Sequence, residues 1–223
     1  MMCAYDRLYL ADAMAVLAEF FEYAVVDYGA EGDEVSDLFC MSPLSDMFAK
    51  GNPSVVSGLS GQELFARLAR ELGYDDTALP KPLFRFEMTL HYWVGWVAAY
   101  VQWRLALSFD ELFRVMPYDE LVARYHPWHE ASEERFCELF VEMARDREAR
   151  VPTRLAASRS ALRLSQRELA HRSRVGLRSI QMYEQRRKDI NKAQAQTLQS
   201  LARVLHCAIE DLMEPVFTLD EVA

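Results

Sequence analysis

Apolar positions recur along the chain at the three- and four-residue spacing of amphipathic helices, and no pair of alternating segments indicates a β-hairpin. Glycine and proline number only eight each, so helices can run without interruption over long stretches. The pattern therefore predicts an all-α protein. In the first 150 residues it predicts helices near residues 6–28, 33–49, 60–73, 85–107, 108–115, 118–125 and 129–149.

Two of these predicted helices open with a capping box, in which a serine side chain and a glutamate three positions later each accept a hydrogen bond from the other residue's backbone. Ser60 with Glu63 opens one helix, and Ser108 with Glu111 opens the other. These signals fix the predicted starts more firmly than the apolar pattern does.

The segment LHYWVGWVAAYVQW, residues 90–103, is the most apolar run. A membrane span needs about 20 such residues, so a buried core helix is the better interpretation. Helical spacing puts four aromatic side chains on one face of this helix. Packing in the core is the simplest role for them, and a pocket for an apolar effector is the alternative. They are Trp93, Trp96, Tyr100 and Trp103.

The pattern changes near REARVPTRL, residues 147–155, where Pro152 disfavours helix at Val151. Beyond it, Ser165 and Glu168 form a third capping box, which predicts a helix from Gln166 to about Arg172. The run SRVG predicts a turn, and a second helix follows from about Leu177. Asn191 and Gln194 resemble another capping pair, with a helix from Lys192 whose apolar face contains Leu198, Leu201, Ala202 and Leu205.

Two short helices joined by a tight turn have the geometry of a helix-turn-helix, whose second helix fits the DNA major groove. Charge supports this interpretation. The whole chain has a net charge of −9, yet residues 1–150 contain 13 basic and 26 acidic residues, whereas residues 151–214 contain 12 basic and 6 acidic residues. A basic segment in an acidic chain indicates nucleic-acid binding by that segment.

The same segment contains a longer motif. The run L-S-Q-x-E-L-A spans residues 164–170, Gly176, Ile180 and Glu184 follow at fixed spacing, and TLQSLARVLHCAIEDLM closes the segment at residues 197–213. In these features the segment resembles the Cro/phage-repressor (XRE-type) helix-turn-helix family, including that family's last helix and its ending. The resemblance covers residues 153–213 without gaps and implies a five-helix domain that binds duplex DNA, usually as a dimer.

The resemblance also implies roles for individual residues. Arg159 matches the arginine that pairs with the glutamate at the end of the recognition helix, here Glu184. Gln166 matches a residue that supports this helix and touches phosphate. Leu177, Arg178 and Met182 match the base-facing positions, and Gln181 beside them would reach phosphate or base. Arg186, Arg187 and Lys188 follow the helix, where contacts with the DNA backbone are common in the family. Arg174 and Lys192 are the other two residues expected to bind DNA.

Three positions depart from the family pattern. Arg174 stands where glycine is usual, which costs about 1 kcal/mol if its backbone is left-handed. Ser173 replaces an apolar residue, and Gly176 replaces the usual serine or threonine cap. Leu177 and Met182 suit thymine methyl groups, and Arg178 suits guanine O6 and N7. These departures bear on operator preference more than on DNA binding.

No other motif predicts chemistry. Four scattered cysteines give neither a zinc motif nor a disulfide framework and are expected to be reduced. YHPWHE, residues 125–130, lacks metal-ligand spacing, and its residues are expected to cap the helix starting near Ala131. No phosphate loop, nucleophile elbow, metal or cofactor is expected. Asp6 and Asp12 interrupt any signal peptide, which favours a cytoplasmic protein.

The sequence thus predicts an acidic helical domain at residues 1–150, a DNA-binding domain at 151–215 and a tail at 216–223. The expected function is transcriptional regulation, most simply repression, without enzymatic activity. The full chain resembles a group of bacterial regulators, which implies no further activity. Aromatic-rich helices at 6–28 and 85–107 are expected to form a homodimer interface, or else to fill the monomer core.

Several alternatives stay open. An antitoxin-type protein would bind a protein partner through its acidic domain and repress the shared operon through its basic one. A ligand-responsive regulator would use the aromatic face, and an enzyme with an appended DNA-binding domain would need a catalytic site that the sequence does not display. The helix pair is alternatively an ordinary part of a bundle with solvated arginines, or a degenerate motif that binds protein.

Overall fold

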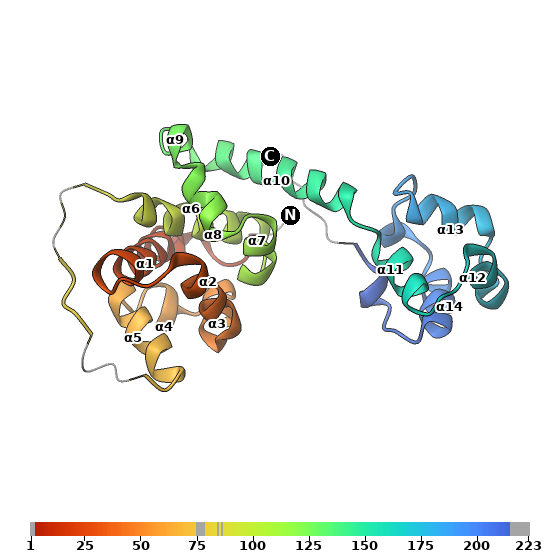
Figure 1. The fold of residues 1–223 in the computed structure, drawn as a ribbon, viewed down its shortest axis with the longest axis horizontal. Helices are drawn as coiled ribbons and strands as arrows, with labels where there is room; N and C mark the ends of the chain where they lie inside the picture. Colours follow the sequence, from red (N-terminus) through yellow and green to blue (C-terminus); the bar gives the residue numbers. More distant parts are fainter. Residues whose placement is uncertain (1–2, 75–78, 84, 86, 215–223) are drawn as a thin grey trace. The chain divides into compact units, whose positions relative to one another are not determined.

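The computed structural model describes residues 3–74, 79–83, 85 and 87–214, and every regular element in these ranges is a helix (Figure 1). The all-α prediction is confirmed for this part of the chain. The chain divides into two compact units, and the division falls at residue 143, within α10 (Glu133–Arg150). We call residues 3–143 the N-terminal unit and residues 144–214 the C-terminal unit, and we describe each by itself.

The N-terminal unit contains ten α-helices in its described residues, preceded by the 3₁₀ turn η1 (Arg7–Tyr9) and with a π-helical turn η2 (Tyr23–Asp27) after the first. The α-helices are α1 (Leu10–Glu22), α2 (Gly32–Met41), α3 (Pro43–Ala49), α4 (Pro53–Val56), α5 (Gly61–Glu71), α6 (Leu90–Leu105), α7 (Phe109–Val115), α8 (Tyr118–Ala123), α9 (Tyr125–Trp128) and most of α10.

Helices α1 and α6 form the centre of this unit and make its most extensive helix pair. They approach so closely at Gly95 that a Cβ there would stand 2.2 Å from the carbonyl oxygen of Leu17. Only glycine allows this approach, and it lets the fully buried Leu17 and Ala18 of α1 pack directly on α6. The two capping boxes at Ser60 and Ser108 form as predicted, at the starts of α5 and α7.

The aromatic side chains of α1 and α6 are mostly inside this core rather than on a surface. Phe20 and Phe21 are fully buried, and Tyr100 and Trp103 are each only 7% exposed. Because α6 is apolar on all sides and buried along ten of its residues, it has little left to offer a dimer interface. For these four residues the burial favours the alternative that they fill the core of the monomer, and the dimer itself stays a prediction. Among the described residues, no helix combines the length and the apolar character that crossing a bilayer requires.

Several predicted helix boundaries are wrong. The predicted helix at 33–49 is two helices, because Pro43 has no N–H to donate and Ser42 adopts extended backbone and caps α3 through Leu44 N. The helix predicted from residue 85 begins at Leu90, where Thr89 caps it. The helix expected near Ala131 begins at Glu133, and the Ser132 hydroxyl, not the histidines of YHPWHE, accepts a hydrogen bond from Arg135 N at 3.3 Å.

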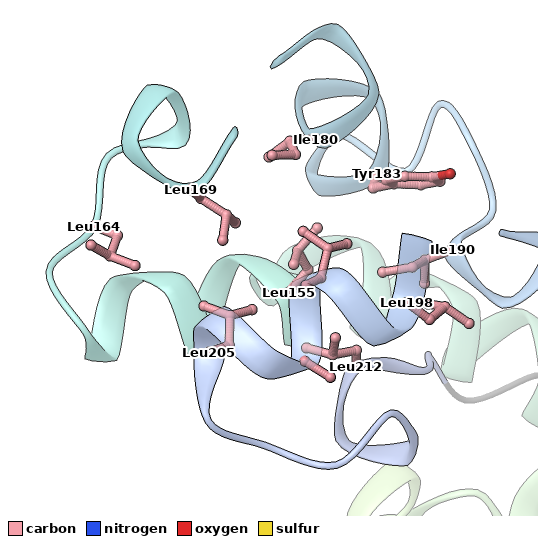
Figure 2. Close-up of a cluster of buried hydrophobic side chains, with 11 residues drawn as sticks. Leu155, Leu164, Leu169, Ile180, Tyr183, Ile190, Leu198, Leu205 and Leu212 are labelled. Atoms are coloured by element: carbon pink, nitrogen blue, oxygen red, sulfur yellow. The ribbon is translucent and has the colours of Figure 1, made fainter. Parts of the chain in front are cut away.

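The C-terminal unit contains the end of α10 and four further helices: α11 (Arg154–Ala161), α12 (Gln166–Ser173), α13 (Leu177–Glu184) and α14 (Ala195–Leu205), with short 3₁₀ turns η4 (Ile190–Lys192) and η5 (Glu210–Leu212). Eleven buried apolar residues form its core, and the labelled ones point toward one another from α11 to η5 (Figure 2). Leu155, Leu169 and Ile180 are fully buried.

Candidate nucleic-acid interface

A capping box fixes the start of α12, the first helix of the α12–α13 pair. At the start of α12, Ser165 Oγ accepts a hydrogen bond from Glu168 N at 3.2 Å, and Glu168 Oε2 accepts one from Ser165 N at 2.7 Å. The hydrogen bonds that the Glu168 carboxylate accepts from Ser165, first from its backbone N–H, lower the pKa of Glu168. The predicted capping box is therefore confirmed, and it sets the helix start by purely local contacts.

The sequence alone does not decide whether the backbone of the turn between the helices is left-handed at Arg174. Arg174 is left-handed, with φ 57° and ψ 22°, and ends α12 where the family usually has glycine. The buried Ser173 donates from Oγ to the carbonyl oxygen of Leu169 at 2.7 Å and accepts from Val175 N at 3.3 Å, so its hydroxyl is satisfied. Gly176 then precedes α13 without any side-chain cap.

Helix α13 has an inner and an outer face. Ile180 and Tyr183 are buried against the core of the C-terminal unit, as Figure 2 shows. The positions expected to face bases lie away from them, with Arg178 exposed and the other three half-buried: Leu177, Gln181 and Met182. An aliphatic, a cationic and an amide side chain thus share one accessible helix face.

Glu184 joins three elements at the end of α13. Arg159 of α11 donates to both of its carboxylate oxygens, from Nε at 2.7 Å and from Nη2 at 2.9 Å, and Gln166 of α12 donates to Oε2 at 2.7 Å. Arg159 also donates to the carbonyl oxygen of Leu164. The side chains of Arg159 and Glu184 are 17% and 6% exposed. The hydrogen bonds to Glu184 raise the pKa of Arg159.

Of the three basic residues that follow α13, Arg186 makes polar contacts within the C-terminal unit. Arg186 is left-handed, with φ 53°, and its guanidinium donates to the carbonyl oxygen of Val151 at 2.9 Å. It also lies 3.3 Å from Glu214 and 3.5 Å from Glu148. Burial and the nearby Glu214 raise the pKa of Glu148. Arg186 therefore ties the segment after α13 to the end of α10. Arg186, Arg187 and Lys188 are all exposed.

A polar groove of about 980 Å³ runs beside the turn, between the end of α12, the segment after α13 and the start of α14. Five cations line it, and none of the described residues lining it is acidic: Arg172, Arg174, Lys188, Lys192 and Arg203. We call it the basic groove. Lys188 Nζ also lies 5.2 Å from the centre of the Tyr183 ring.

The start of α14 supplies further positive potential to the basic groove. Gln194, Gln196 and Thr197 line it, and no acidic residue stands in the first turn of α14 to offset the positive end of the helix dipole. Backbone N–H groups at such a terminus bind anions. Arg172, Arg203 and this terminus are not among the residues that the sequence motif indicates, because only the fold brings them beside Arg174 and Lys188.

The expected capping pair of Asn191 and Gln194 is wrong. Asn191 exchanges two hydrogen bonds with the backbone of Glu214, at 2.8 and 2.9 Å, and Asp189 instead caps η4. As a result α14 begins at Ala195 rather than at Lys192. Lys192 is left highly exposed at 85% of its side chain, with Asp189 3.8 Å away.

The aromatic positions of α6 divide into two groups. Trp93 and Trp96 line a small pocket, whereas Tyr100 and Trp103 pack in the core, where Trp103 Nε1 donates to the carbonyl oxygen of Tyr5 at 2.8 Å. The four cysteines are free thiols. In the described part of the chain, no three histidine, cysteine, aspartate or glutamate side chains form a group able to hold a metal ion.

A scan against protein-family models, a search of curated proteins and a search of solved structures each found no match to this chain.

Proposed function

We propose that the protein is a transcriptional regulator of the cytoplasm that binds duplex DNA through α12 and α13 and acts as a repressor by occupying its operator. In this proposal α13 enters the major groove, and the outer face formed by Leu177, Arg178, Gln181 and Met182 reads base edges. The cations around it hold phosphates and release counterions from the DNA.

The observation that carries the proposal is the basic groove. Five cations and the start of α14 surround it, although the chain as a whole has a net charge of −9. A concentration of one sign of charge in an oppositely charged protein suits a polyanion. The groove adjoins the turn before α13 and the segment that follows that helix, so the cations lie close to both ends of the proposed recognition helix.

The supporting contacts of α13 are consistent with this role. A recognition helix must be held rigidly, because affinity falls when side chains are ordered only on binding. Arg159 and Gln166 hold the end of α13 through Glu184, and Ile180 and Tyr183 anchor its inner face. These contacts lie at the end and on the inner face of α13, so they leave its outer face accessible.

The test is to select binding sites for the full-length protein from a random duplex pool and to measure affinity against salt concentration. Arg178→Ala should cost about 1–3 kcal/mol on the selected site and relax the preference at one base pair. Arg187→Ala should weaken binding to all sequences alike and reduce the slope of log affinity against log salt by about one unit.

Lys50→Ala is the matched control, because it removes one exposed cation from the N-terminal unit. It should leave both the affinity and the salt slope near the wild-type values. Failure to enrich any sequence at low salt would contradict the proposal. An equal loss of specific and random affinity in Arg178→Ala would contradict the base-reading role of that residue.

A further inference from the structure

A pocket of about 270 Å³ lies in the N-terminal unit, bordered by the first half of α6, by α9 and by the start of α10. Four aromatic side chains line it: Tyr92, Trp93 and Trp96 of α6 and Tyr125 of α9. We call it the aromatic pocket. Its volume suits a ligand of a few heavy atoms rather than a drug-sized molecule.

The rings of the aromatic pocket are held by contacts with one another and with the core. Tyr92 and Trp96 stack with ring centres 6.1 Å apart, and Trp93 meets Tyr125 edge-on at 5.6 Å. Trp93 also packs against the buried Phe136 at 5.3 Å. Rings that are already fixed lose little freedom when a ligand binds, so the aromatic pocket is preorganised.

Negative charge accompanies these rings. Glu133 lines the aromatic pocket and accepts a hydrogen bond from Trp96 Nε1 at 2.7 Å, which uses one of the acceptor positions of its carboxylate. Glu22 does not line the pocket, but its Oε1 accepts a hydrogen bond at 3.4 Å from the backbone N–H of Thr89, which does. None of the described residues that line the aromatic pocket is lysine or arginine. Burial, followed by the charges of Glu19 and Glu22, raises the pKa of Tyr92.

These features select for one class of ligand. The faces of tryptophan and tyrosine carry negative potential and attract cations, and aromatic cages hold quaternary ammonium ions in this way. A nearby carboxylate adds to this attraction and disfavours anions. The geometry points to a small organic cation, a quaternary or alkyl ammonium ion, as the ligand of the aromatic pocket.

A metal ion is a poor alternative occupant. Hard cations take six or more oxygen ligands and strip some of their water to do so. Glu133 is the one carboxylate that lines the aromatic pocket among the described residues, and the other walls are aromatic or aliphatic apart from a threonine and a histidine. An alkyl ammonium ion, by contrast, gains from aromatic walls because its charge is spread over apolar groups.

The experiment compares two probes of equal shape by calorimetry on the full-length protein. Choline carries a quaternary ammonium group, and 3,3-dimethylbutan-1-ol replaces its nitrogen with carbon and is neutral. Choline should bind at least about tenfold more tightly than the alcohol. Equal affinities, or no choline binding at concentrations on the order of 10 mM, would overturn the inference.

Variants assign the effect to the aromatic pocket. Glu133→Gln removes the charge and keeps an amide oxygen for Trp96 Nε1, so choline affinity should fall about tenfold while that of the alcohol stays the same. Tyr92→Leu removes one ring and should weaken choline by several-fold. Glu138→Gln is the control, because Glu138 is exposed on α10 and does not line the pocket. Unchanged choline affinity in Glu133→Gln with an unchanged melting temperature would overturn the inference.

Discussion

At the scale of single residues, Glu184 links three helices of the C-terminal unit through its carboxylate. Its carboxylate is only 6% exposed and accepts three hydrogen bonds, two from Arg159 and one from Gln166. A buried charge is costly unless it is paired, and removing one partner leaves the other without compensation. Removing one partner of the Arg159–Glu184 pair should therefore destabilise the unit by more than the intact pair stabilises it.

Glu184→Ala should lower the free energy of unfolding of the C-terminal unit by about 3 kcal/mol, the lower end for a buried pair because the Arg159 side chain keeps 17% of its exposure. Hydrogen exchange of peptides from residues 155–212, measured in the full-length chain, gives this value directly. Glu210→Ala removes an exposed acid of the same unit and should change it by less than about 0.5 kcal/mol. Equal protection in the two variants would rule out the buried pair as a stabilising contact.

At the scale of elements, the connection between α12 and α13 holds an arginine in a backbone conformation that favours glycine. Arg174 is left-handed, a conformation that costs an L-residue about 1–2 kcal/mol relative to the right-handed one. Glycine avoids this cost but gains freedom in the unfolded chain, which offsets part of the benefit. An arginine retained there supplies a charge to the basic groove.

Arg174→Gly should therefore stabilise the C-terminal unit by about 0.5 kcal/mol and at the same time weaken binding to all duplex sequences. Arg172→Gly makes the same chemical change two positions earlier, inside α12, where glycine should destabilise the helix by about 0.5–1 kcal/mol. Hydrogen exchange of residues 166–184 and DNA titrations measure the two effects separately. Opposite signs of the two stability changes are the expected result; equal signs would contradict the account of this turn.

The elements also show which features can be predicted from sequence. The starts of α5, α7 and α12 were predictable because a capping box needs only residues three positions apart. The start of α14 was not predictable, because the Asn191 side chain hydrogen-bonds to the backbone of Glu214, 23 positions away, instead of capping the helix. The break before α3 was available in the sequence as Pro43, and the apolar pattern on either side of it concealed the break.

Part of the candidate site could likewise be predicted from the sequence, and part depends on the fold. The outer face of α13 follows from helical periodicity alone, so Arg178 and its neighbours could be identified without a structure. The basic groove could not, because Arg172 and Arg203 become neighbours only through the packing of α12 on α14. Arg186 also has contacts that the sequence does not indicate, since its guanidinium donates to Val151 and Glu214, and its expected phosphate contact stays a prediction.

At the scale of the whole molecule, the apolar surface is unevenly distributed. The C-terminal unit uses most of its apolar residues in its own core. Of the large hydrophobic side chains that are exposed among the described residues, two belong to it, Val151 and Leu162. The others belong to the N-terminal unit: Leu8, Val26, Tyr28, Met41, Leu72, Tyr74, Leu83 and Met88. Exposed apolar side chains are commonly buried in homodimer interfaces.

We therefore expect the full-length protein to be a dimer through its N-terminal unit, even though the aromatic residues of α1 and α6 are mostly buried. One helix-turn-helix reads only a few base pairs, and specific affinities of about 10⁻⁸ M or better generally require two. A two-fold dimer would place two recognition helices about 34 Å apart and favour palindromic sites. Sedimentation of the full chain at micromolar concentration should give a dimer.

A fragment of residues 151–223 is the matched comparison, provided that its helical circular dichroism shows that it folds. It lacks the exposed apolar side chains of the N-terminal unit, so it should sediment as a monomer and bind the selected site far more weakly than the full chain. A monomeric full-length protein would contradict the prediction. It would instead favour a regulator of the antitoxin type, in which the same exposed side chains of an acidic unit are covered by a different protein, and co-purification with a second polypeptide would then be expected.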